Sequence, residues 1–294
     1  MFERADVVYV FDGSYEGLLC CVFESYARKE TPRDVVPELD EQLTFYERRY
    51  VSTDETKAGR VERGIIKAAR TEAAETGRLF YLTCCQEKGI TFLLYAQICL
   101  TYGAKTHLMI TDDTIKKVRE AVSHLTREAH QLKGFVRFSV NGSAMTSIIE
   151  PKNFVLPLLR EYFCNRYRNE AFLIYDKAHK AALIYSSGES DIIPVEDFEE
   201  PETEDDEERF RELWRLFYNT VAIEERENPR CRMSHMQKRY WEHMTEMRCT
   251  QESGVRNQGL VTGRGGLHGG KKTEKTARRE ARVCDLSCVQ YADG

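Results

Sequence analysis

The sequence lacks any apolar run long enough to cross a lipid bilayer. Its longest candidate, residues 90–100, has 11 residues and includes Thr91 and Gln97, whereas a spanning helix needs about 20 residues. The first residues carry mixed charges and no small-residue cleavage site, which is unlike a signal peptide. We therefore expect no membrane partner and a cytoplasmic location.

The ten cysteines show no CxxC spacing. Cys284 and Cys288 form a lone CxxxC, which has fewer ligands than a zinc or iron–sulfur site needs. The other cysteines stand in two adjacent pairs or singly within apolar runs. A large chain without a secretion signal keeps its thiols reduced, so we expect most of these residues to be small apolar members of the core.

The common catalytic motifs are also missing. No GxSxG occurs, and no set of histidines and carboxylates has ligand spacing, since His235 and His243 would supply only two ligands. Residues 265–271 fit GxxxxGK, but Lys272 stands where a phosphate-binding loop needs Ser or Thr, and no buried strand precedes the glycines. The sequence thus predicts neither a metal nor a cofactor.

The chain has no excess of basic residues, since its net charge is −5. Ten carboxylates lie in residues 196–208, and without them the remainder would carry +5. We interpret residues 196–208 as an acidic loop, either a solvated linker or a docking segment for a basic partner. The net negative charge of the chain therefore says little about the charge of the surfaces outside residues 196–208.

Hydrophobic residues make up 41% of the chain and aromatic residues 11%, which is enough to bury a core. Residues 250–294 instead have little apolar periodicity and predict a disordered tail. We expect one α+β domain over residues 1–249, with a division into two subdomains near residue 133 as the alternative.

The first half of the chain alternates between short strands and helices. We expect strands over residues 7–11 and 47–52 and a loop over residues 29–42. Helices are predicted over residues 15–27, with Ser14 as N-cap, over residues 54–75, ended by Gly77, and over residues 86–101.

The second half begins with a helix that opens at Asp112 and ends at Gly134. Its apolar stripe is Ile115, Val118, Val122, Leu125, Ala129 and Leu132. Strands are predicted at residues 135–140, 145–150, 172–175 and 182–185. A helix over residues 154–167 lies between the two pairs of strands. Later helices are expected around residues 210–221 and 235–247. This order predicts an antiparallel sheet with packed helices, an α+β fold.

Two carboxylates are the candidates for catalysis. Asp12 follows the first strand and precedes a helix, where it could act as a base, although capping of the helix alone explains this residue type and is the favoured interpretation. Asp176 lies in the turn of the second predicted hairpin. An enzyme that acts on a nucleobase would need one of these two carboxylates beside the pocket that holds the nucleobase.

Residues 222–248 combine cations with aromatic rings. Guanidinium groups bind phosphates in a bidentate manner and exposed rings stack on bases. In the alternative, Tyr240, Trp241 and Met244 anchor a helix in the core and the charges face solvent. The nucleic-acid candidates in this stretch are Arg226, Asn228, Arg230, Lys238, Arg239, Tyr240 and Trp241.

Several long segments resemble one bacterial family described only as a DNA metabolism or DNA repair family. These segments are FDGSYEGLLCCVFESY, KGFVRFSVNGSAMTSIIEP, EYFCNRYRNEAFLIYD and FYNTVAIEERENPRCRMSHMQKRYWEHMTE, within residues 5–249. Members of that family are typically encoded beside a radical-SAM protein, and in some bacteria a similar domain is fused to a uracil-DNA glycosylase domain. Two positions depart from the family pattern: Gln237 stands where the family usually has a proline, and Tyr162 stands where many members have a histidine before Phe163.

The resemblance implies a DNA repair protein that binds DNA and works with a radical-SAM partner. Arg137 and Arg166, which lie beside aromatic residues in family-like segments, join the candidates for the DNA contact. Two alternatives stay open: a glycosylase-like or lyase-like enzyme that acts on a base, and a protein–protein adaptor without catalytic activity.

Overall fold

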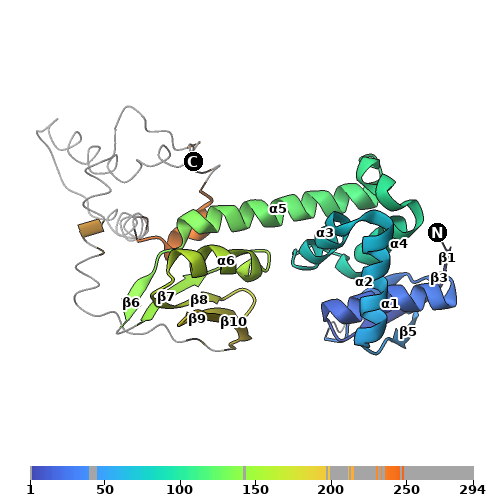
Figure 1. Cartoon of the computed structure of the whole chain (residues 1–294), viewed down its shortest axis with the longest axis horizontal. Coiled ribbons are helices and arrows are strands. Elements are labelled where there is room, and N and C mark those ends of the chain that lie inside the picture. The colour runs from blue at the N-terminus through green and yellow to red at the C-terminus, as the bar shows by residue number, and fades with distance from the viewer. Residues whose placement is uncertain are drawn as a thin grey trace, which may run out of the picture. The chain divides into compact units, whose positions relative to one another are not determined.

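The computed structural model describes residues 2–39, 45–141, 144–196, 198, 211, 213–214, 230, 233, 236–245 and 247. They belong to two compact units (Figure 1). Unit 1 contains residues 1–129 and 152–155, and unit 2 contains residues 130–151 and 156–294. Among the helices of the described ranges, none combines the length and hydropathy that a bilayer-spanning segment requires.

Unit 1 is built on a parallel sheet of three strands. The central strand β2 (Val7–Phe11) lies between β4 (Asp34–Pro37) and β5 (Glu47–Tyr50), while the short strands β1 (Glu3–Arg4) and β3 (Glu30–Thr31) form a separate parallel pair. The helices of unit 1 are α1 (Tyr15–Arg28), α2 (Glu55–Ala69), α3 (Thr71–Tyr81), α4 (Lys88–Tyr102), the 3-10 helix η1 (Gly103–Leu108) and the greater part of α5 (Asp113–Phe135).

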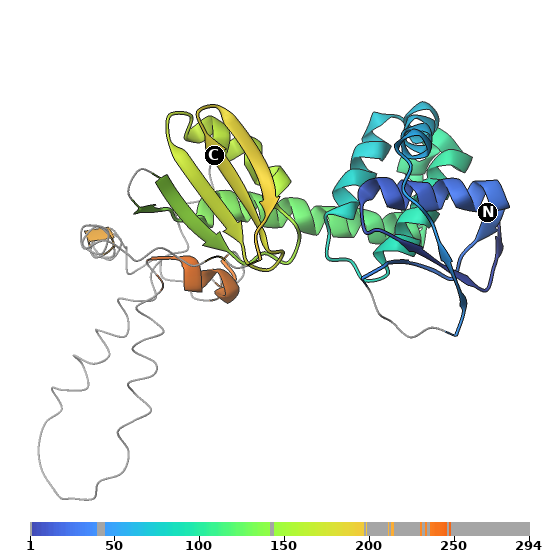
Figure 2. The ribbon, with the colours of Figure 1, turned by 90° about the horizontal axis from the view of Figure 1, so that it is seen from below.

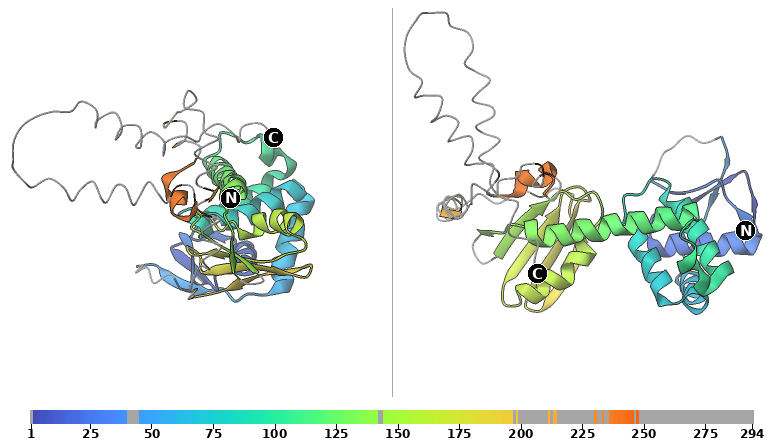
Figure 3. Two further views of the ribbon diagram at one scale, coloured as in Figure 1. Left: turned by 90° about the vertical axis from the view of Figure 1, so that its left-hand side faces the viewer. Right: turned by 90° about the horizontal axis from the view of Figure 1, so that it is seen from above.

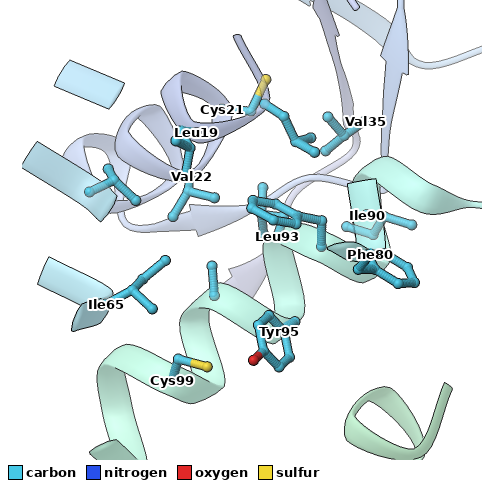
Figure 4. Packing of buried hydrophobic residues seen from close by; sticks show 14 of the residues in the cluster. Leu19, Cys21, Val22, Val35, Ile65, Phe80, Ile90, Leu93, Tyr95 and Cys99 are labelled. Atoms are coloured by element: carbon cyan, nitrogen blue, oxygen red, sulfur yellow. The ribbon is translucent and has the colours of Figure 1, made fainter. Parts of the chain in front are cut away.

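Helix α4 lies at the centre of the unit 1 core, as its uniformly apolar sequence predicts. Leu93 and Cys99 on α4 are fully buried and pack with side chains of α1 and α2, such as Val22 and Ile65 (Figure 4). Complete burial of a leucine-sized side chain contributes about 1.5–3 kcal/mol. Helix α4 and the buried strand β2 therefore both contribute to the core of unit 1.

Unit 2 is built on a mixed sheet of five strands in the order β10-β9-β8-β7-β6. The strands are β6 (Ser139–Asn141), β7 (Ala144–Ile149), β8 (Ala171–Asp176), β9 (Ala181–Ser186) and β10 (Glu189–Pro194). Helix α6 (Leu156–Arg166) lies across one face of the sheet (Figures 2 and 3). The 3-10 helix η3 (Lys238–His243) adds Tyr240 and Trp241 to the buried residues of this unit.

The predicted α+β class is confirmed, and three of the four strand pairs in unit 2 are antiparallel. The pair β7–β8 is parallel because α6 connects the two strands and returns the chain to the same end of the sheet. The sheet of unit 1 is parallel, whereas the antiparallel arrangement was predicted from the strands of the second half of the chain, and no strand direction was predicted for the first half.

Two element predictions in unit 1 are wrong. The helix expected over residues 54–75 is broken at Arg70, and Gly77 does not end a helix but is buried within α3. The loop expected over residues 29–42 contains the strands β3 and β4. Pro37 ends β4 at the edge of the sheet, where a missing backbone donor is tolerated.

The stripe predicted for the helix that opens at Asp112 is confirmed, since Ile115, Val118 and Leu125 are at most 2% exposed. Of the six cysteines in the described part of the chain, Cys20, Cys21 and Cys99 are buried. The proposed tail at residues 250–294, and residues 197 and 199–208 of the acidic segment, lie outside the described residues.

Candidate nucleic-acid interface

An open depression of about 510 Å³ lies on the surface of unit 2. One of its residues comes from the end of α5 and the others come from α6. We call it the α6 depression, and its lining residues are Lys133, Leu158, Glu161, Tyr162, Asn165 and Arg166.

The helical period explains why these side chains share one surface. Positions 158, 161, 162, 165 and 166 are spaced by three and four residues, which places them on one face of α6. The buried residues Leu156, Leu159 and Phe163 occupy the opposite face, against the sheet. Lys133 follows Leu132, the last buried residue of the α5 stripe, and is half-buried.

Both cations of the depression lie near tyrosine rings. The Nζ atom of Lys133 is 5.4 Å from the centre of the Tyr162 ring, and the Cζ atom of Arg166 is 5.8 Å from the centre of the Tyr167 ring. A hydrogen bond with the Tyr167 hydroxyl, followed by the charge interaction with Tyr162, raises the pKa of Arg166. The depression therefore has two cationic side chains, Lys133 and Arg166, against one carboxylate, Glu161.

The Tyr167 ring is held by an aromatic cluster. Its centre lies 5.2 Å from that of Phe138 and 6.3 Å from those of Phe163 and Phe172. Aromatic pairs at such separations contribute about 0.5–1.5 kcal/mol each beyond the area that they bury. Arg166 thus lies over a fixed ring, and its position does not depend on a mobile loop.

The chain matches the family model described as a domain of unknown function, DUF4130, over residues 86–246. The match spans more than half of the chain. This protein is a member of the DUF4130 family. The DUF4130 region begins just before α4, includes every described element of unit 2 and contains the whole α6 depression. No curated protein matches the chain.

Tyr240 and Trp241, also within the DUF4130 region, do not form an exposed stacking surface. They are 3% and 8% exposed, and the Trp241 indole Nε1 donates a hydrogen bond to the Met236 carbonyl, 3.2 Å away. The Tyr240 ring lies 5.7 Å from the Phe135 ring. The proposed contact role of these two rings is therefore corrected: they are core anchors, as in the alternative interpretation.

The neighbouring cations are engaged with the same rings. Arg239 lies over the Tyr240 ring, with 4.6 Å between Cζ and the ring centre, and it donates to the Tyr240 hydroxyl. The Nζ atom of Lys238 lies 5.8 Å from the centre of the Trp241 ring. Both residues therefore support the packing of η3, and neither lines the α6 depression.

Of the remaining cationic candidates, the described residues Arg137 and Arg230 do not line the α6 depression. Arg137 donates to the carbonyl oxygens of Gly134, at 2.7 Å, and Val136, at 3.2 Å, which closes the end of α5. Arg230 is exposed, while Arg226 and Asn228 lie outside the described residues. Among the predicted residues that the structure describes, Arg166 alone lines the α6 depression.

The two carboxylates considered for catalysis hold turns. Asp12 is exposed and accepts hydrogen bonds from the Ser14 amide at 2.9 Å, the Ser14 hydroxyl at 2.6 Å and the Thr53 hydroxyl at 2.8 Å. Desolvation raises the pKa of Asp12, but these hydrogen bonds outweigh it and hold the pKa below its usual value. Asp12 therefore supports Ser14, the predicted N-cap of α1, which accepts from the Gly17 amide.

Asp176 is fully buried at the end of β8. Its carboxylate accepts from the amides of Ala178 and His179, each at 3.1 Å, and contacts the His179 Nδ1 atom at 2.8 Å. These bonds close the β8–β9 hairpin. Because the carboxylate is enclosed and is not a lining residue of the α6 depression, it is poorly placed to reach a base there.

The sequence did not reveal a group of possible metal ligands in unit 2. One ligand atom each of Glu150, Glu242 and His243 lies within 4.8 Å of the others. The Lys177 ammonium is 2.7 Å from Glu150, and the pKa of Lys177 is raised chiefly by that hydrogen bond and to a smaller extent by Glu242. The lysine already supplies the positive charge that a metal ion would bring, so we assign this group to an ion-pair cluster.

Proposed function

We propose that this DUF4130 protein acts in DNA repair or DNA metabolism, binds nucleic acid at the α6 depression and works with a radical-SAM protein. The resemblance of its segments to the DNA repair family supports the biological setting. One observation carries the binding part: Lys133 and Arg166 converge with the half-buried Tyr162 on a single open surface.

Such a surface suits a single strand better than a duplex. Cations that lie along a depression neutralise phosphates, and an accessible ring stacks on a base only where that base is unpaired. Tyr162 is the ring in the depression, and it stands where many members of the resembling family have a histidine. In this protein a larger ring therefore takes the stacking position.

Fluorescence anisotropy with a labelled single-stranded oligonucleotide tests this proposal. Lys133→Gln should weaken binding about three- to tenfold because one phosphate contact is lost, and Tyr162→Ala about tenfold because one base loses its stacking partner. Lys116→Gln is the matched control, since Lys116 lies exposed on the same helix outside the depression. An equal loss in Lys116→Gln would show that overall charge, and not this surface, governs binding.

The radical-SAM partner requires a separate experiment. Affinity purification of the full chain from cells that also express the neighbouring radical-SAM protein should recover both proteins, with or without nuclease treatment. Recovery only when DNA is intact would mean that the two proteins meet on DNA and do not bind each other, and absence of the partner in both preparations would remove it from the proposal.

A further inference from the structure

Besides the α6 depression of unit 2, the protein has a pocket in unit 1, which takes no part in the function proposed above. It encloses about 430 Å³ between the α2–α3 junction, α4, η1 and the start of α5. Three of its lining residues are the basic residues Arg70, His107 and Arg119, and the buried residues Tyr95 and Ile115 form an apolar part of its wall. We call it the Arg70 pocket.

The two arginines of this pocket are unpaired within the described part of the chain. No hydrogen bond or ion pair joins the side chain of Arg70 or Arg119 to a described residue. Elsewhere in unit 1, Arg28, Arg49 and Arg78 each pair with a glutamate. The guanidinium groups at the Arg70 pocket thus keep all of their donors for a ligand.

The charge around the pocket is positive. Glu72 is its one lining carboxylate, against two arginines. The His107 Nδ1 atom contacts the Ala104 carbonyl, which fixes the orientation of the ring. Helix α3 begins at this wall without a side-chain cap, so its first amides add to the positive potential.

Arg70 is held in a backbone conformation that an arginine rarely adopts. Its φ of 74° and ψ of 170° lie in a region populated almost only by glycine. The chain therefore places a long cationic side chain at a junction where glycine would be free of strain.

We infer that the Arg70 pocket binds a phosphate monoester, that is, an organic molecule that carries one terminal phosphate. A phosphate dianion accepts bidentate hydrogen bonds from guanidinium groups, and two arginines match its two charges. The organic group would lie against Tyr95 and Ile115, and a volume of about 430 Å³ falls in the range of small-molecule sites. The phosphate could belong to a free small molecule or to the 5′ end of a nucleic acid.

Calorimetric titration of the full chain tests this inference with three probes: inorganic phosphate, a nucleoside 5′-monophosphate and the same nucleoside without phosphate. We expect the monophosphate to bind most tightly, inorganic phosphate more weakly and the nucleoside not at all. Arg119→Gln should weaken the monophosphate at least tenfold, whereas Arg63→Gln, an exposed arginine of α2 outside the pocket, should bind as the wild type does.

Arg70→Gly separates binding from folding. It should weaken the monophosphate as Arg119→Gln does, and its thermal midpoint should not fall, because glycine adopts this φ without strain. Failure of phosphate and monophosphate to bind at millimolar concentration, or wild-type binding by both pocket variants, would overturn the inference.

A pair of oligonucleotides identifies the source of the phosphate. If a 5′-phosphorylated strand binds more tightly than the same strand with a 5′-hydroxyl, and Arg119→Gln removes the difference, the ligand is a nucleic-acid end. If the two strands bind alike while the monophosphate binds in the pocket, the ligand is a free small molecule. Both results leave the test of the α6 depression unaffected, since that test uses other variants.

Discussion

At the scale of single residues, buried carboxylates that accept backbone hydrogen bonds fix the turns of both units. Glu128, on α5, is 3% exposed and accepts from the amides of Lys152 and Asn153 and from the Asn153 side chain, at 2.6–3.0 Å. Asn153 in turn accepts from the Cys84 amide at 3.0 Å. These bonds explain why residues 152–155 belong to unit 1 although their neighbours in sequence belong to unit 2.

Replacement of Glu128 by alanine should therefore destabilise unit 1. The substitution leaves buried amides without an acceptor, which costs about 2–4 kcal/mol, and Glu128→Gln, which keeps one oxygen, should cost less. Hydrogen exchange at residues 152–154 and in α5 measures the effect. Unchanged protection in Glu128→Ala would contradict the anchoring role.

Asp12 gives a prediction that depends on pH. Its pKa is lowered in the folded chain, so its contribution to stability is present above the unfolded pKa of about 3.9 and is lost as the pH falls through the folded pKa. Asp12→Asn should destabilise α1 by about 0.5–1 kcal/mol at neutral pH, and the difference from the wild type should shrink as the pH falls through the folded pKa of Asp12. Hydrogen exchange of the α1 amides at several pH values checks this, and an equal difference at every pH would contradict it.

The roles of some residues could be predicted from their neighbours in sequence, and the roles of others could not. Ser14 was identified as a cap because a strand, a turn and an apolar helix follow one another within a few residues. The burial of Tyr240 and Trp241 depends on packing with distant residues such as Phe135, and a basic flanking sequence is compatible with either environment. Lys133 was missed because nothing local indicates that the end of α5 lies beside α6.

At the scale of elements, α4 and β4 approach each other closely in unit 1. A Cβ atom on Gly89 would lie 1.9 Å from the Val35 carbonyl oxygen, an impossible separation that only movement of the helix or the strand can relieve. Glycine is therefore required at this position of α4.

Gly89→Ala should destabilise unit 1 by about 2–3 kcal/mol or prevent its folding, as overpacking against backbone does. Gly134→Ala is the matched control, because no atom lies within 4 Å of a Cβ there and alanine favours the helix by up to about 1 kcal/mol. Urea denaturation followed by circular dichroism measures both variants. A Gly89→Ala variant as stable as Gly134→Ala would contradict the described packing.

Elements with a strong period were predictable, and those defined by partners were not. The α5 stripe and the β8–β9 hairpin follow from spacing alone. The break at Arg70 carries no glycine or proline signal, so the sequence indicated one helix where α2 and α3 are separate. Strand β4 was missed because Pro32 precedes it and Pro37 is its last residue, and because its identity depends on pairing with β2.

At the scale of the whole molecule, the parallel sheet of unit 1 was not predictable from local pattern. Strand direction is set by how the chain returns to the sheet, and the connections to β4 and β5 bring together residues far apart in sequence. The same reason limits prediction of the site: Arg166 was selected for its neighbours in sequence, while its partners in the α6 depression come from folding.

The central claim is that Lys133 and Arg166 contact a sugar-phosphate strand. Its most direct test is the salt dependence of single-stranded DNA binding by the wild type and by a Lys133→Gln, Arg166→Gln double variant. Each lost phosphate contact should reduce the slope of log affinity against log salt by about 0.7, so the two slopes should differ by about 1.4. Equal slopes, or no binding by the wild type at low salt, would contradict the claim.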